Sequence, residues 1–343
     1  MKTYPILLAF LSAALFGAST PASKVLLNTF PPFQLAGLLY LGAAVGVAPI
    51  ILRDSRLQSS WQLERRNRYR LLGAIASGGI LAPVFLLLGL KLASAASVSL
   101  WLNLELVATT ILGYCFFHDH LGRWGWFGVF GTILAAALLS WGEGIAGIQA
   151  GLLVAIACLC WGLDNHLTAL IDGISPAQST FWKGLIAGSV NLTIGIAIQP
   201  NLASPKAIVA GLAVGALSYG ASMVLYITSA QNLGATRSQM IFSCAPFFGV
   251  AFSAFALGEA ISLIQKVAVL LKVSSLLALL QDQHSHEHEH ESMFHKHLHS
   301  HDDEHHIHLA QPASLPHSHW HEHEPMFHAH PHLPDIHHRH KDN

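Results

Sequence analysis

The chain has 343 residues, of which 52% are hydrophobic and only 11% are charged, and its mean hydropathy is +0.46. Soluble globular proteins carry about 25% charged residues, so this composition argues against a soluble protein and predicts one that is embedded in a membrane. The net charge of −1 is the sum of two opposite parts. Residues 1–280 hold 15 Lys and Arg against 8 Asp and Glu, whereas residues 281–343 hold 3 against 11. We expect a lipid bilayer as the partner of the first part, and no nucleic acid.

Apolar runs of about 20 residues, the length that a membrane-spanning helix needs, recur along the first part. They cover approximately residues 5–27, 33–52, 71–91, 96–117, 124–142, 150–170, 177–199, 207–230, 238–258 and 263–280. Prolines 31, 32, 176, 200 and 205 fall in the connections, where a missing backbone donor costs least. The expected fold is therefore an all-α integral membrane protein with ten transmembrane helices.

The orientation follows from the basic residues in short loops, which stay in the cytoplasm. Segment 53–70, between the second and third spans, carries six arginines against two acidic residues. Placing it inside puts the N-terminus inside, and ten spans return the C-terminus to the same side. Lys91 and Lys206 fall on the outer side and are a minority. We predict a multi-pass protein of the inner or plasma membrane with both termini cytoplasmic.

The first 280 residues contain two similar halves. Phe16-Gly17 corresponds to Trp161-Gly162, and Glu105 corresponds to Pro246, with offsets of 145 and 141 residues. Five spans per half is an odd number, so the second half enters the membrane upside down, as in many secondary transporters. A central site is expected between the halves, and only the first half supplies an acid there. The predicted domains are a first repeat at 1–145, a second repeat at 146–280 and a tail at 281–343.

Several short motifs stand at equivalent places in the two halves. The first half has Phe16-Gly17-Ala18-Ser19, Asn103-Leu104-Glu105 and His118-Asp119-His120-Leu121-Gly122, and the second has Cys160-Trp161-Gly162, Ala245-Pro246 and Leu257-Gly258-Glu259. With these motifs in this order, residues 5–280 resemble the EamA-type drug/metabolite transporter superfamily. The resemblance implies a ten-helix carrier that moves small solutes, often outward. Two features depart from it: the lysines Lys266 and Lys272 in the last span, and the long histidine-rich tail.

Glu105 lies about midway along the fourth span. An ionisable group inside a membrane is costly and usually marks a functional site. We interpret Glu105 as a carrier of a proton or cation that ionises when a cavity opens. The alternative is a structural carboxylate that is hydrogen-bonded to Asn103, Thr109 or Thr110.

The sixth span contributes Asp164 and His166 as further site candidates. They lie about 200° apart on a helix, so one rigid helix cannot aim both into one cavity. Either Gly162 permits a local break in the helix, or one of the two lies near the cytoplasmic end and is solvated. Lys183, at the start of the seventh span, either neutralises Asp164 or Glu105 or extends to the cytoplasmic surface.

Catalytic motifs do not stand out in the sequence. No phosphate-binding loop of the Walker type is found, so ATP-driven pumping has no support. No Ser/His/Asp arrangement stands out either. We therefore expect a protein that is not an enzyme and requires no cofactor.

Residues 281–343 hold 21 of the 24 histidines. Their composition predicts a disordered tail, yet residues 284–299 recur at 317–332 with 12 of 16 positions identical. Neutral imidazole is a good ligand for zinc, nickel and cobalt, so the tail is predicted to bind such ions. The candidate ligands are His284, His286, His288, His290, His295, His297, His299, His317, His319, His321, His323, His328, His330 and His332.

We therefore expect a secondary transporter that works by alternating access. The sharpest hypothesis is proton-coupled efflux of divalent metal ions, with the tail collecting them. An exporter of an organic metabolite or drug, with the tail as a metal or pH sensor, is the main alternative. A membrane-anchored metal-storage protein is the second alternative. A homodimer is left open.

Overall fold

The computed structural model describes two separate units of the chain. The described residues are 3–53, 65–117, 122–171, 174–200, 203–233, 241–281, 284–290, 293–299, 317–323 and 326–332. One unit is helical and is formed within Met1–Asp282, and the other is formed by the tail within Gln283–Pro334. Residues 54–64, which contain most of the predicted cytoplasmic segment, and the predicted motif His118-Asp119-His120 lie outside the described residues.

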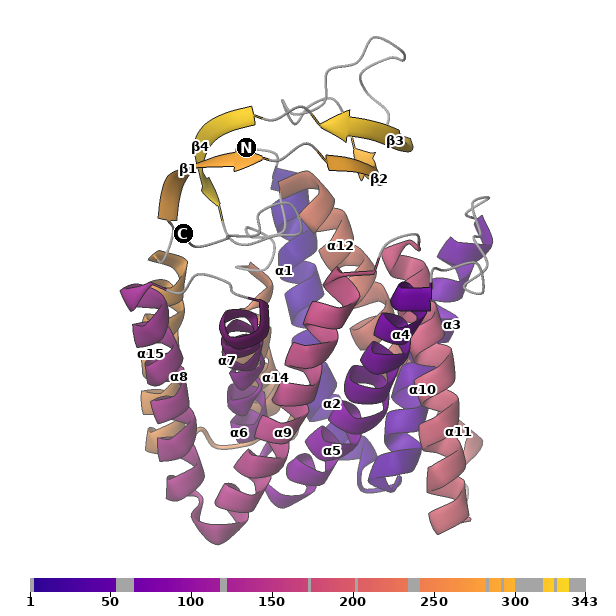
Figure 1. Ribbon diagram of the computed structural model, residues 1–343. Helices are drawn as coiled ribbons and strands as arrows, with labels where there is room; N and C mark the ends of the chain where they lie inside the picture. Colours follow the sequence, from indigo (N-terminus) through magenta and orange to yellow (C-terminus); the bar gives the residue numbers. More distant parts are fainter. Residues whose placement is uncertain are drawn as a thin grey trace. The chain divides into compact units, whose positions relative to one another are not determined.

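The helices of the first half follow the five predicted spans (Figure 1). They are α1 (Thr3–Gly17), α2 (Ser19–Leu26), α3 (Pro32–Arg53), α4 (Arg65–Ala74), a π-helical segment at Ile75–Leu81, α5 (Ala82–Leu92), α6 (Ala95–Trp101), α7 (Leu104–Leu112), a second π-helical segment at Gly113–Phe117, and α8 (Arg123–Gly142). The first, third and fourth spans are thus each built from more than one helical piece.

The second half repeats this plan in its eighth span, which again contains a π-helical segment, whereas its sixth span is one continuous helix. It contains α9 (Gly144–Ala169), α10 (Pro176–Ile198), α11 (Pro205–Val214), a π-helical segment at Gly215–Ala221, α12 (Ser222–Leu233), α14 (Ala245–Leu257) and α15 (Leu263–Gln281). The start of α10 shows how the sequence sets a helix boundary. Ser175 accepts a hydrogen bond from the backbone of Gln178 at 3.3 Å, the Gln178 side chain accepts one from the Ser175 backbone at 3.0 Å, and Pro176 occupies the first turn.

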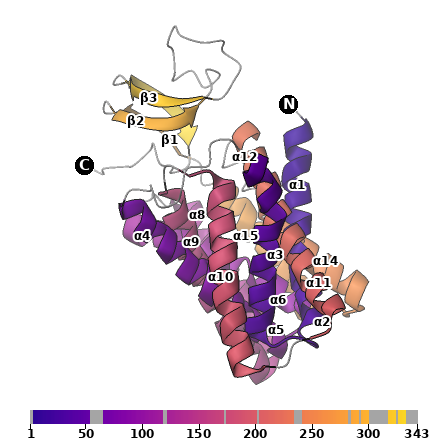
Figure 2. The same ribbon diagram turned by 90° about the vertical axis from the view of Figure 1, so that its right-hand side faces the viewer.

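Helix contacts repeat between the halves. The second span packs against the seventh (α3 on α10), and the fifth packs against the tenth (α8 on α15). The contact of α1 with α12 has its counterpart in that of α9 with α5, and α7 on α9 has its counterpart in α14 on α1. Figure 2 shows α3 and α10 side by side. These pairings are those that a pseudo-two-fold axis between two inverted five-helix repeats would produce.

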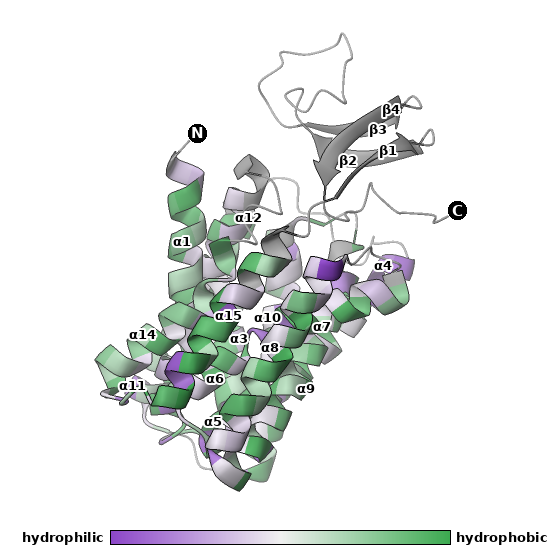
Figure 3. Cartoon of the chain, turned by 90° about the vertical axis from the view of Figure 1, so that its left-hand side faces the viewer, coloured by the Kyte–Doolittle hydropathy of each residue, from purple (hydrophilic) through white to green (hydrophobic). Residues whose placement is uncertain are grey.

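The helical unit has the character of a membrane protein. Eight helical stretches among the described residues are long and apolar enough to cross a bilayer, which supports eight of the ten predicted spans. Of the other two, α14 has 13 residues and α15 has 19. Large apolar side chains such as Phe127, Phe130 and Leu134 on α8 are exposed, as expected for a face toward lipid. Figure 3 shows hydrophobic residues along most of each helix and hydrophilic ones at the start of α4.

The tail unit contains four strands, β1 (His284–His290), β2 (Met293–His299), β3 (His317–His323) and β4 (Met326–His332). They form two antiparallel ribbons, β1 with β4 and β2 with β3. In these four stretches the structure differs from the predicted disorder. The physical reason is that the alternating pattern of each copy has the two-residue period of a strand, and a second copy of the same pattern is available to pair with it.

Candidate functional site

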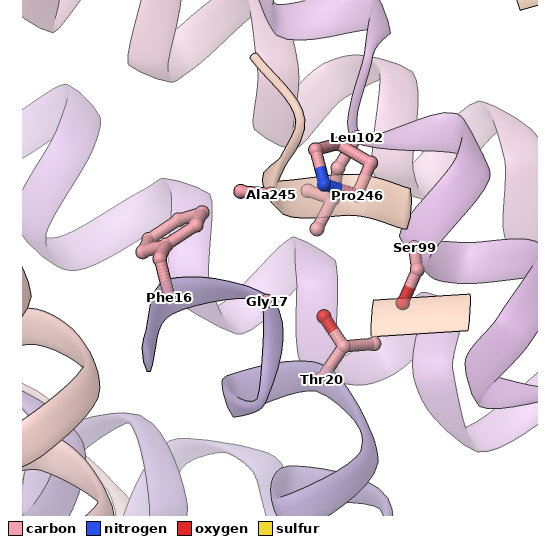
Figure 4. Close-up of a pocket in the computed structure, with 7 residues that line it drawn as sticks. All are labelled: Phe16, Gly17, Thr20, Ser99, Leu102, Ala245 and Pro246. Atoms are coloured by element: carbon pink, nitrogen blue, oxygen red, sulfur yellow. The ribbon is translucent and has the colours of Figure 1, made fainter. Parts of the chain in front are cut away.

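Three interrupted helices meet at a small pocket in the helical unit (Figure 4). The interruptions lie at Ala18, between α1 and α2, at Leu102 and Asn103, between α6 and α7, and at Cys244, just before α14. The lining residues are Phe16, Gly17, Thr20, Ser99, Leu102, Ala245 and Pro246. Breaks of this kind expose backbone groups in the middle of a membrane and are tolerated where they line a cavity. Residues of both repeats thus line the pocket, with Ala245 and Pro246 contributed by the second.

The close approach of the helices around this pocket depends on glycine. A Cβ on Gly17 would collide with the backbone carbonyl oxygen of Ala245, and a Cβ on Gly249 would collide with the Ser99 hydroxyl. The Ser99 side chain is 1% exposed, and among the described residues its hydroxyl has no hydrogen-bond partner. Because a buried polar atom without a partner is costly, this hydroxyl is suited to bind a group that enters the pocket.

The break between α6 and α7 is supported by a buried lysine. The side-chain nitrogen of Lys272, on α15, donates to the carbonyl oxygen of Leu100 at 2.5 Å, and Lys272 is 2% exposed. This carbonyl lies at the C-terminal end of α6, where the helix dipole favours a positive charge. Cys158 lies 3.8 Å from the carbonyl oxygen of Trp101 in the same break. Lys272 therefore supplies a hydrogen-bond donor to the C-terminal end of a half-helix.

Glu105 is the second residue of α7, just as Pro246 is the second residue of α14, in agreement with the predicted correspondence. Its carboxylate accepts a hydrogen bond from Asn165 of α9 at 3.1 Å. Asn165 also donates to the Thr109 hydroxyl at 3.2 Å. The Asn103 amide instead donates to the carbonyl oxygen of Leu100 at 3.4 Å. The hydrogen bond to Glu105 thus comes from Asn165, a residue that the sequence did not suggest as its partner.

Asp164 and Lys183 bind to each other rather than to Glu105. The Lys183 ammonium lies 2.6 and 2.7 Å from the two carboxylate oxygens of Asp164, and the Thr168 hydroxyl donates to the same carboxylate at 2.9 Å. Of the predicted alternatives for Lys183, the structure therefore supports pairing with Asp164. His166 faces another neighbour than Asp164, as the angle of about 200° between them on the helix requires. Its ring nitrogen lies 2.8 Å from the carbonyl oxygen of Thr109 on α7. The helix α9 is continuous through Gly162, so the first of the two alternatives, a break in this helix, does not occur.

The end of the bundle opposite the N-terminus is closed by polar contacts between the repeats. The Glu259 carboxylate accepts hydrogen bonds at 2.9 Å from the backbone N–H groups of both Ala95 and Ala96, at the start of α6. Gln265 donates to the hydroxyls of Ser94 and Ser97 at 3.2 and 2.9 Å. Glu259 and Gln265 come from the second repeat, and the groups they bind come from the first. The start of α6 is therefore tied to the opposite repeat.

Glu143, in the turn between α8 and α9, belongs to the same set of contacts because it accepts a hydrogen bond from the Ser97 hydroxyl. Burial raises the pKa of the Glu143 carboxyl above its ordinary value of 4.5. The hydrogen bond from Ser97 opposes this shift, and the negative charge of Glu259 adds to it. Two carboxylates from different repeats thus lie close enough to affect each other.

Comparison with known proteins now assigns the family. The model of the EamA-like transporter family matches residues 3–141 and 149–281, one copy in each half. The chain belongs to the EamA-like transporter family. Membership makes it a multi-pass membrane transporter of small solutes and not an enzyme. The predicted family is confirmed, whereas the substrate and the orientation of the termini stay predictions.

Individual relatives of this EamA-family chain are distant. It is 25% identical over 275 residues to an uncharacterized transporter of Methanothermobacter thermautotrophicus (strain Delta H), covering 74% of this chain and 79% of the relative. A protein of known crystal structure aligns with a TM-score of 0.57 and 18% identity, covering 82% of this chain and 99% of the other. The latter likeness shows the fold alone.

Sequence reasoning on this EamA-family transporter missed Thr20, Ser99, Asn165 and Gln265. Polar residues such as these are common within membrane helices or at their ends, and they form no pattern that marks them as functional. The Ser94-to-Ser97 spacing at the start of α6 was a usable signal, because Ser94 caps that helix through the Ser97 backbone.

Proposed function

We propose that this EamA-family transporter is a secondary carrier that moves its solute by alternating access around the pocket at the three helix breaks. The observation that carries this proposal is the convergence of the breaks at Ala18, Asn103 and Cys244 on one space between inverted repeats. Half-helix ends present unpaired backbone groups and partial charges to a ligand without the cost of a full charge in the membrane.

The contacts at the end opposite the N-terminus supply one gate. Glu259 and Gln265 hold the start of α6 from the other repeat. Rocking of the repeats requires these hydrogen bonds to break, and water that enters the opened end can replace them. The pocket lies behind this gate, so opening it would release a solute on the far side, which is the outer side under the predicted orientation.

Glu105 is the proposed coupling residue. It stands in the first turn of α7, where the N-terminal end of the half-helix stabilises a carboxylate, and its partner Asn165 is neutral. A carboxylate with a neutral partner can gain or lose a proton without leaving an opposite charge unpaired. Asp164 cannot do so as easily, because its proton uptake would strand Lys183.

The lining of the pocket favours a small organic solute. It offers the aromatic ring of Phe16, the hydroxyl groups of Thr20 and Ser99, and the apolar surface of Leu102 and Pro246. Hydroxyl groups and a ring suit a molecule with an apolar part and one or two hydrogen-bonding groups. In this version of the proposal, the carrier exports an organic solute and the tail senses metal or pH.

Efflux of a divalent metal ion is the second candidate, and the observation that favours it is the fourteen histidines of the two tail repeats. In the helical unit, the described residues contain no group of three or more His, Cys, Asp or Glu side chains placed to hold a metal. A metal cargo would then pass the pocket with part of its water shell, held by hydroxyl and carbonyl oxygens.

Transport in proteoliposomes with an imposed pH gradient tests the proposal. The probes are zinc, nickel and cobalt chlorides for the metal candidate and a mixture of neutral amino acids for the organic one. We expect gradient-driven movement of one class, and Glu105→Gln should abolish accumulation while keeping exchange between equal concentrations. The exchange shows that the variant is folded. Accumulation by Glu105→Gln equal to that of the wild-type protein would refute the coupling role.

Deleting residues 283–343 separates the candidates. A metal carrier should retain reduced metal flux, an organic exporter should move no metal with or without the tail, and a storage protein should lose all its metal-related function.

A further inference from the structure

The two histidine repeats pair with each other, and the pairing places histidine opposite histidine. In the first ribbon, β1 with β4, the opposed pairs are His284 with His332, His286 with His330, and His288 with His328. In the second ribbon, β2 with β3, they are His295 with His321, His297 with His319, and His299 with His317. Each ribbon joins one half of the first copy to the other half of the second copy.

Strand alternation puts these pairs on one face of each ribbon. Successive residues of a strand belong to opposite faces, so the even-numbered histidines of β1 share a face with the even-numbered histidines of β4. The odd-numbered histidines of β2 and β3 share a face in the same way. Seven of the fourteen histidines fall on each face. The opposite face of each ribbon carries the residues between the histidines, among them Glu287, Glu289 and Glu322.

The spacing of the pairs suits metal coordination. Directly opposite residues of an antiparallel ribbon have Cβ atoms about 4.5–5.5 Å apart, and residues two apart in a strand are separated by about 6.7 Å. Two neighbouring pairs thus place four histidines at the corners of a rectangle of roughly these sides. Zinc takes four ligands, which is the number of histidines that two neighbouring pairs bring together.

We propose that the two copies of the repeat form two metal sites between them, one on each ribbon, that bind zinc, nickel or cobalt through histidines of both copies. In this arrangement one copy alone is an incomplete site. The metal links β1 to β4 and β2 to β3, so binding orders the tail. Because each histidine face offers nitrogen ligands, magnesium and calcium, which prefer oxygen, are poor competitors. This inference extends the proposed function but does not depend on whether the cargo is a metal.

The experiment measures zinc binding to the full-length protein in detergent micelles, by calorimetric titration with a competing chelator. Three double variants address the ribbons. The β1 variant is His286→Ala with His288→Ala, the β4 variant is His328→Ala with His330→Ala, and the β2 variant is His295→Ala with His297→Ala. The matched control is His305→Ala with His306→Ala, which removes two histidines from the spacer between the copies.

The β1 and β4 variants should each lose one of two tight sites, weakening it by more than the ~10-fold that loss of an outer-shell partner costs. Combining the β1 and β4 variants in one protein should remove no further binding site, because both variants change the same ribbon. Combining β1 with β2 should lose both sites, although both changes lie in the same copy. In the reverse pattern, the combined β1 and β4 variants lose two sites and the combined β1 and β2 variants lose one. That result would show that each copy binds metal alone and would overturn the proposal. So would a spacer variant as damaging as the β1 variant, or equal competition by magnesium. None of these readouts involves transport, so a failure here is distinguishable from a failure of the proposed carrier mechanism.

Discussion

The ion pair of Asp164 and Lys183 predicts a large and strongly non-additive effect on stability. The side chains of Lys183 and Asp164 are 17% and 8% exposed, and the ammonium lies 2.6 Å from the nearer carboxylate oxygen. Lys183→Met removes the positive charge and leaves the Asp164 carboxylate with the hydrogen bond that it accepts from the Thr168 hydroxyl. An uncompensated buried charge costs about 3–5 kcal/mol. Adding Asp164→Asn removes that charge, so the double variant should recover most of the loss, ending within about 1–2 kcal/mol of the wild-type protein.

Unfolding in mixed micelles, followed by the change in helix content, measures these differences in the free energy of unfolding. The matched control is Lys206→Met, since Lys206 is exposed at the start of α11, and its effect should stay within about 0.5 kcal/mol. If Lys183→Met costs no more than Lys206→Met, the pair does not hold a buried charge. If the double variant loses as much as Lys183→Met and the single variant Asp164→Asn together, packing rather than charge explains the losses, and the reasoning fails.

Two further predictions concern packing and pH. Gly17→Ala should destabilise the protein by about 1–3 kcal/mol, because its Cβ would meet the backbone carbonyl of Ala245. The control is Gly211→Ala, whose Cβ would approach only side-chain atoms, at 3.3 Å. An equal loss of stability in both variants would contradict the argument. Because folding raises the pKa of Glu143, its stabilising contribution is complete below pH 4.5 and is lost as the pH rises through the folded value. As the pH rises from 4.5 through the folded pKa of Glu143, the Tm of the wild-type protein should therefore fall more steeply than the Tm of Glu143→Gln. Parallel curves of Tm against pH would exclude a contribution of Glu143 to the pH dependence of stability.

The sequence predicted the general fold because hydrophobicity and the repeat are both visible in one dimension. Apolar length located eight spans that the structure bears out. The repeat also predicted that Glu105 and Pro246 are equivalent, and each is the second residue of its half-helix. The same repeat extends to a feature that was not predicted, the π-helical segments at Ile75–Leu81 and Gly215–Ala221 in the third and eighth spans.

The partners of the buried polar groups could not be predicted in the same way. Glu105 was expected to meet Lys183, or else Asn103, Thr109 or Thr110, yet it accepts a hydrogen bond from Asn165, next to Asp164 on α9. Neighbours in sequence on one helix point about 100° apart, so the identity of the partner depends on how α9 is rotated against α7 and α10. That rotation is set by packing over whole helices, and no local pattern reports it.

By itself, the sequence determined that this protein is helical and membrane-embedded, that it is built from two inverted halves, and that Glu105 has no acidic counterpart in the second half, where Pro246 stands. It also determined that two histidine repeats follow. Tertiary structure alone decided that three helix breaks share one pocket, that Lys272 faces the carbonyl of Leu100, and that Glu259 holds the start of α6. The physical reason is that burial and periodicity are properties of consecutive residues, whereas hydrogen bonds inside a membrane form between residues that only the packing of distant helices brings together.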